Sequence, residues 1–201
     1  MHRGSAALTA AATAVLVCAG CTESVTFSDR APASSRSARV SGALEQLPET
    51  STAHRPVDID SGEEQRVLGE VSRGKEHIVA YTEGDKCGMH LVPADPSGQA
   101  GSDTLAAWPT DEPADSSGLP LGPYSVDSTS SYGHNKASWA TLRCSKDAIV
   151  IEYGSDVNTP VTGMRGSVST VTPDKSRNDV TIVVAESRDR LRILTKLTRQ
   201  S

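Results

Sequence analysis

The sequence predicts a mainly β fold: a small antiparallel sheet, a sandwich or an open barrel, with one helix at the C-terminal end. Several short runs rich in Val, Ile, Thr and Tyr are separated by turn residues, which is typical of strands joined by tight connections. Hydrophobic residues make up 36% of the 201 residues and aromatic residues only 3%, so the core must be small and mostly aliphatic. The sequence contains neither an internal repeat nor a second long hydrophobic run.

The first expected strands form consecutive hairpins. Residues 65–71 and 76–83 are apolar runs on either side of residues 72–75, whose glycine suits a tight turn. A third run, residues 87–94, begins after another glycine-containing turn at 83–86. Short turns of this kind connect antiparallel neighbours.

Four more runs in the second half of the chain have strand character. Residues 138–145 and 147–154 are β-rich, residues 163–171 alternate in character, and residues 179–186 form a nearly continuous β-branched run. Within the last run, Val180–Val184 have the composition of a central strand that is buried on both faces.

The C-terminal residues 186–199 fit two patterns. Leu191, Ile193 and Leu197 would line one face of a strand, whereas Ile193, Leu194 and Leu197 would form a helical stripe. Arg, Leu and Lys dominate this segment and Gly and Pro are absent, so its propensity favours a helix.

Residues 93–136 form a long stretch rich in Pro, Gly, Ser and Asp, in which residues 104–108 and 124–128 are candidate short strands. A loop of this length in a compact domain is usually functional or disordered. We therefore place a candidate ligand-binding surface here, because exposed aromatic side chains make good contact anchors. The residues assigned to it are Trp108, Tyr124, Tyr132, His134 and Trp139. The alternative is that the two tryptophans are core residues.

The N-terminus has the features of an export signal. Arg3 supplies a positive charge, and residues 6–17 are uncharged and mostly Ala, Leu, Val and Thr. A run of about a dozen residues is too short to cross a bilayer of about 30 Å as a helix, but it matches the apolar region of a signal peptide. The alternative is a buried N-terminal helix, which the absence of a polar face disfavours.

The apolar run ends in Cys18-Ala19-Gly20-Cys21, which resembles the lipobox of bacterial lipoproteins. The resemblance covers only the signal region and concerns processing. It implies that residues 1–20 are removed and that the thiol of Cys21 receives a diacylglycerol group, whose two acyl chains hold a protein stably on a bilayer. Cys18 stands where the pattern usually has an aliphatic residue, which leaves open ordinary signal-peptidase cleavage near Ala19 or Gly20.

The count of cysteines agrees with this resemblance. Of the four cysteines, Cys18 would leave with the signal and Cys21 would carry lipid, so that Cys87 and Cys144 remain. Export places both in an oxidising compartment, and each lies at the edge of an expected strand, so we expect a disulfide. The alternative is a zinc site, because Cys87 and His90 have a C-x-x-H spacing. The second half of the chain offers no matching short spacing, so no metal site is predicted.

We expect the mature chain to consist of an anchor, a spacer and one domain. Residues 21–62 comprise the lipidated cysteine and a Ser-, Ala- and Pro-rich segment that cannot bury enough apolar surface to offset its ordering entropy. A flexible coil of about 40 residues has an r.m.s. length of roughly 35 Å, enough to hold a domain clear of a membrane. The single β-rich domain would then span residues 63–201.

No catalytic set emerges from the sequence. Ser72 and Lys75 match the S-x-x-K motif of β-lactamases and penicillin-binding proteins. The later motifs of those enzymes are incomplete here, and Ser72 lies at an expected turn instead of opening a helix. The acidic residues of 58–64 begin like a calcium loop, but their glycine comes one position early, which favours a solvated acidic face.

The expected function follows from the cellular location that the N-terminal residues predict. A formal net charge of −5 argues against nucleic acid as a partner, because nucleic acid requires a clustered basic surface. We expect a monomer, lipid-anchored on the extracytoplasmic face of the cell membrane, with no cofactor. Its domain would bind or scaffold an envelope protein or polymer without catalysis. The alternative is a cell-envelope hydrolase whose active site the sequence does not reveal.

Overall fold

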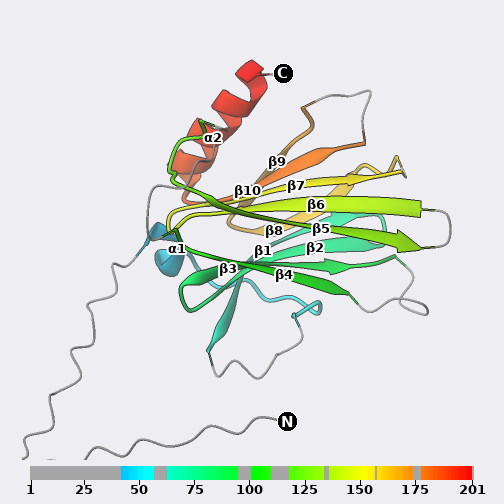
Figure 1. Ribbon diagram of the computed structural model, residues 1–201, viewed down its shortest axis with the longest axis horizontal. Helices are drawn as coiled ribbons and strands as arrows, with labels where there is room; N and C mark the ends of the chain where they lie inside the picture. Colours follow the sequence, from blue (N-terminus) through cyan, green and yellow to red (C-terminus); the bar gives the residue numbers. More distant parts are fainter. Residues whose placement is uncertain are drawn as a thin grey trace, which may run out of the picture. The chain divides into compact units, whose positions relative to one another are not determined.

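Two antiparallel five-stranded sheets enclose a shared hydrophobic core in the computed structural model of the chain (Figure 1). The structure describes residues 42–56, 63–94, 101–109, 118–133, 136–156, 158–173 and 178–200. These residues form no closed barrel, and the two separate sheets share the core that lies between them, which is the sandwich among the three expected architectures. The prediction of a mainly β fold is confirmed.

The first sheet has the strand order β4-β3-β2-β1-β8. Its strands are β1 (Gln65–Arg73), β2 (Glu76–Glu83), β3 (Lys86–Val92), β4 (Ser102–Ala107) and β8 (Val161–Gly166). The expected hairpins are present: Gly74 and Gly84 occupy the β1–β2 and β2–β3 turns with φ angles of 60° and 58°. Glycine takes this left-handed conformation without the steric cost that a Cβ imposes.

The second sheet has the strand order β5-β6-β7-β10-β9. Its strands are β5 (Ser125–Gly133), β6 (Lys136–Cys144), β7 (Ile149–Ser155), β9 (Val168–Val171) and β10 (Val180–Val184). β10 pairs with a strand on each side, and all of its residues are buried. The prediction of a central strand covered on both faces is confirmed.

The C-terminal segment is a helix, α2 (Ser187–Gln200), which packs on the outer face of the second sheet. Ile193 is fully buried in one cluster with Val150 of β7 and Val183 of β10, and Leu194 and Leu197 are partly buried beside it. These buried positions have helical spacing, so the prediction of a helix is confirmed.

Residues 163–171, expected as one strand, belong to two different sheets. β8 ends at Gly166 in the first sheet, and β9 begins at Val168 in the second. The chain turns at Gly166, where φ is 82° and a Cβ would collide with the carbonyl oxygen of Leu68. The expectation of one strand was wrong because alternation along a run does not reveal where the chain changes sheet.

The core between the sheets is mostly aliphatic, as the composition predicts. Met89 of the first sheet and Ile151 of the second belong to the same buried cluster. A disulfide joins Cys87 of β3 to Cys144 at the end of β6 inside that cluster, with the two Cα atoms 5.6 Å apart. The predicted disulfide is confirmed, and it links the two sheets.

The packed part of the chain begins before residue 63. A short helix, α1 (Ala43–Gln46), places Leu44 in the main core with no exposed surface. Arg66 of β1 donates hydrogen bonds to the carbonyl oxygens of Glu45 and Leu47, and the backbone N–H of Thr50 donates to the carbonyl oxygen of Val67. The expected boundary is therefore corrected: residues 42–56 pack on the sandwich and are not part of a free spacer.

Candidate functional site

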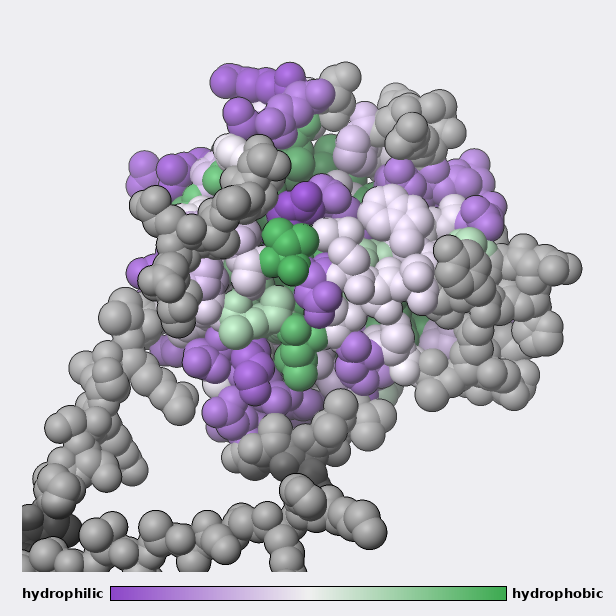
Figure 2. All heavy atoms as spheres, in the orientation of Figure 1, coloured by the Kyte–Doolittle hydropathy of each residue, from purple (hydrophilic) through white to green (hydrophobic). Residues whose placement is uncertain are grey.

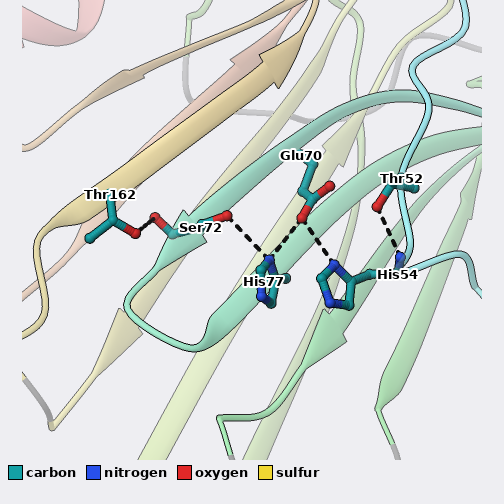
Figure 3. Close-up of polar contacts among 6 residues, drawn as sticks. All are labelled: Thr52, His54, Glu70, Ser72, His77 and Thr162. Carbon is teal, nitrogen blue, oxygen red and sulfur yellow. Dashed lines mark hydrogen bonds and ion pairs between the residues drawn. The ribbon is translucent and has the colours of Figure 1, made fainter.

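The most concentrated group of chemically active side chains lies on the outer face of the first sheet (Figure 3). It consists of His54 from the segment before β1, Glu70 of β1 and His77 of β2, and one potential ligand atom of each lies within 4.8 Å of the others. Glu70 Oε1 is 3.1 Å from His54 Nδ1 and 2.7 Å from His77 Nδ1. We call these three residues the His–Glu cluster.

A bulge in β1 places Glu70 in this cluster. The pairing of β1 with β2 shifts register between Val67 and Gly69. As a result Leu68 and Val71 both belong to the main core, although strict alternation would put them on opposite faces. Glu70, between them, faces outward. The register then places His77 opposite Ser72, diagonal to Glu70.

The segment before β1 positions His54, the third member of the cluster. Thr50 is hydrogen-bonded to β1 at Val67 and Leu68, which holds this part of the chain along the strand. The Thr52 hydroxyl accepts a hydrogen bond from the backbone N–H of His54. The His54 ring stacks on the ring of His77, with centroids 3.7 Å apart and planes 26° apart.

Glu70 is an ionised carboxylate in a buried position, only 3% exposed. Burial by itself raises the pKa of Glu70, but the Thr52 hydroxyl and the rings of His54 and His77 outweigh it and lower the pKa below its usual value. The second oxygen, Oε2, is buried and has no partner with full hydrogen-bond geometry. The Thr52 hydroxyl and the two histidines together therefore compensate the burial of this carboxylate.

The arrangement does not form a nucleophilic triad. In a Ser-His-acid triad, the serine and the carboxylate contact opposite nitrogens of the imidazole. Here the Ser72 hydroxyl lies 3.2 Å from His77 Nδ1, the same nitrogen that faces Glu70. His77 thus cannot take a proton from Ser72 while donating one to Glu70. Ser72 also accepts a hydrogen bond at its backbone carbonyl from the Thr162 hydroxyl, on the neighbouring strand β8.

Of the five aromatic or histidine residues assigned to a ligand surface, one is buried and a second is partly buried. Tyr124 is 1% exposed, and its hydroxyl donates to the carbonyl oxygen of Pro120 at 2.6 Å. Trp108 is partly buried against the main core. The side chain of Tyr132, all of His134 and the lipidation residue Cys21 lie outside the described parts. Tyr124 therefore does not contribute to a surface, and the assignment of Tyr132 and His134 stays a prediction.

Trp139 is the most exposed of the three described side chains in this set, with 39% of its surface exposed. It lies on β6 opposite Gly154 of β7, and a Cβ on Gly154 would collide with the indole. The ring thus covers the backbone of the next strand. On the face shown in Figure 2, exposed hydrophobic side chains form small areas separated by hydrophilic ones.

The zinc site weighed for Cys87 and His90 is not formed. Cys87 lies in the core within the disulfide, whereas His90 faces outward and its Nδ1 lies 2.8 Å from Asp103 Oδ1 of β4. Residues three apart in a strand point to opposite faces, so a C-x-x-H spacing does not converge there.

Sequence reasoning missed the His–Glu cluster for identifiable reasons. His54 falls within the expected spacer, and Glu70 and His77 lie in expected strands where no motif distinguishes them from their neighbours. One signal was present: Gly69 lies inside an expected strand, and glycine in that position often marks a bulge. The bulge would have moved Glu70 to the face of His77.

No protein-family model matches this chain, and comparison with curated proteins and with solved structures gives no significant match. Among the described residues, no helix has the length and apolar character needed to span a bilayer. The structure defines the class of the fold, a two-sheet antiparallel β-sandwich with one covering helix. Because no relative was found, the function is inferred from the residues of this chain and their arrangement.

Proposed function

We propose that this chain is an exported lipoprotein, held on the extracytoplasmic face of the cell membrane through an acylated Cys21. Its β-sandwich binds an envelope protein or polymer and catalyses no reaction of its own. In this proposal residues 1–20 are the signal peptide, and the packed domain begins near residue 42.

The observation that carries the proposal is the disulfide between Cys87 and Cys144 in the centre of the core. Structural disulfides persist in oxidising compartments and are rare where thiols are kept reduced. This supports export, and the resemblance of residues 18–21 to a lipobox supports retention at the membrane after export. Two acyl chains give stable anchoring, whereas a single chain gives only marginal binding.

A binding role is favoured over hydrolysis by the geometry around Ser72. Within the part of the chain that the structure describes, Ser72 lies beside a histidine and a buried carboxylate, but it approaches the wrong ring nitrogen for proton transfer. Among the assigned contact residues with described side chains, Trp139 retains the exposed aromatic surface that a partner would use.

The intact mass of the protein from its native host, before and after reduction and alkylation, tests this proposal. We expect a chain that begins at Cys21 and carries the added mass of the acyl groups, with Cys87 and Cys144 alkylated only after reduction. A Cys21→Ser variant is the matched control, since it should lose the acyl mass and leave the membrane fraction or stay unprocessed. An unacylated wild-type chain cut near Ala19 or Gly20 would refute the anchor.

A further inference from the structure

The His–Glu cluster has the composition of a metal site. Two imidazoles and one carboxylate are a donor set that Zn²⁺ and other divalent first-row ions favour, with open positions left for water. The three side chains come from three segments, yet their nearest ligand atoms lie within 4.8 Å of one another. This places nitrogen and oxygen donors around a space that one ion can bridge.

The charge of the cluster also suits a cation. An ionised carboxylate that is 3% exposed is costly unless it is paired. Both imidazoles contact the same oxygen, Oε1, and the buried Oε2 has no partner with full hydrogen-bond geometry. A divalent ion would place opposite charge directly beside this carboxylate.

Both imidazoles can reach solvent and exchange their bound proton for an ion. The side chains of His54 and His77 are 32% and 21% exposed, so an ion has access without unfolding of the sheet. The two Nδ1 atoms face Oε1 of Glu70, which in the metal-free protein requires that both carry the proton. Binding at Nδ1 moves that proton to Nε2 or to water, so acid competes with the metal.

One rearrangement is needed. The rings are stacked with planes 26° apart, and the in-plane lone pairs of nearly parallel rings do not meet at one point. At least one ring must therefore rotate about its Cβ–Cγ bond. We assign this rotation to His54, whose side chain is the more exposed of the two, 32% against 21%.

We propose that His54, Glu70 and His77 bind one divalent transition-metal ion, with Zn²⁺ as the representative case, on the outer face of the first sheet. Because His54 lies on the segment upstream of β1, the bound ion cross-links this segment to β1 and β2. The metal thereby ties the part of the chain that leads toward the N-terminus to the sandwich. This inference does not depend on acylation of Cys21, so either proposal can fail alone.

Calorimetric titration of the full, oxidised chain with Zn²⁺ at neutral pH, without a polyhistidine tag, tests the site. We expect one Zn²⁺ ion per chain. The variants His54→Gln, Glu70→Gln and His77→Gln should each weaken the affinity for Zn²⁺ by more than about 100-fold. That loss is larger than the loss caused by removing a residue that only hydrogen-bonds to a metal ligand. Hydrogen exchange of the amides in residues 48–56 should slow when Zn²⁺ is added to the wild type, and should not change in Glu70→Gln.

The matched control is His90→Gln, which removes another outward-facing histidine of the same sheet outside the cluster. Its affinity for Zn²⁺ should equal that of the wild type. His54→Gln alters a partly exposed side chain outside the strands, so it keeps the test valid even if the Glu70 variant does not fold. A wild type that binds no Zn²⁺, or cluster variants that bind as well as the wild type or the His90 control, would overturn the proposal.

Discussion

At the scale of single residues, the position of Glu70 shows how one backbone irregularity decides the chemistry of a face. With strict alternation along β1, Glu70 would share the face of Leu68 and point into an aliphatic core. A carboxylate there would have no histidine partners and a large desolvation cost. The bulge between Val67 and Gly69 turns it outward instead, where His54 and His77 contact it.

The pKa of Glu70 gives a pH dependence with a definite sign. Its folded-state pKa is below the usual value of 4.5, so the unfolded chain takes up the proton first as the pH falls. The carboxylate therefore contributes stability that is fully present above about pH 4.5 and is lost as the pH falls through the folded-state pKa.

Urea unfolding of the wild type and of Glu70→Gln, measured at a series of pH values, checks this. We expect the free energy of unfolding of the wild type to exceed that of the variant most above about pH 4.5, and the difference to shrink in more acidic solution. A difference that stays constant with pH would show that Glu70 does not titrate differently in the two states.

At the scale of elements, the two faces of β10 explain why its residues are buried throughout. Its inner face contributes Ile182 to the core between the sheets, and its outer face contributes Val183 to the cluster under α2. The helix is thus required to cover a strand whose outer face is as apolar as its inner one. Ile193 is the helix residue that is fully buried in this contact, with no exposed surface.

Truncation of Ile193 should therefore weaken the protein far more than truncation of a neighbour on the same helix. For Ile193→Ala we expect a loss of about 2–5 kcal/mol in the free energy of unfolding, from lost transfer energy and the cavity left behind. Leu191→Ala is the matched control: Leu191 is 66% exposed, and surface changes usually cost within about 0.5 kcal/mol. Equal losses in the two variants, measured by chemical denaturation, would contradict the packing of α2.

At the scale of the whole molecule, the disulfide adds a covalent cross-link between two sheets that the chain already connects. Cys87 and Cys144 are 57 residues apart in sequence. On the chain-entropy model, a cross-link over such a loop restricts the unfolded chain by about 4 kcal/mol. That is a large part of the stability of a domain whose core is small and nearly free of aromatic residues.

The double variant Cys87→Ala/Cys144→Ala measures this contribution without leaving a free thiol. We expect its free energy of unfolding to fall by about 4 kcal/mol, with a smaller urea midpoint. Reduction of the wild type under the same conditions should lower the midpoint in the same direction. A variant as stable as the wild type would show that packing alone holds the two sheets together.

Much of the architecture could be predicted because it depends on local patterns. Glycines fixed the turns at 74 and 84, β-branched residues identified the strand at 180–184, and the spacing of Ile193, Leu194 and Leu197 favoured a helix. The candidate site could not be predicted in the same way. Its three members lie before β1, on β1 and on β2, and neither the strand period nor the helical period relates residues that are separated by a turn or a loop.

The sequence by itself determined the mainly β class, the hairpins, the C-terminal helix and the pairing of Cys87 with Cys144. Turn residues and periodicity are properties of neighbouring positions, and the number of cysteines is a property of the chain as a whole. Only the tertiary structure decided that the sheets form a sandwich, that residues 42–56 pack on it, and that the chain changes sheet at Gly166. It also brought His54, Glu70 and His77 together. Their contact depends on a register shift and on a segment laid along β1, and both follow from backbone pairing between distant positions, which no local pattern records.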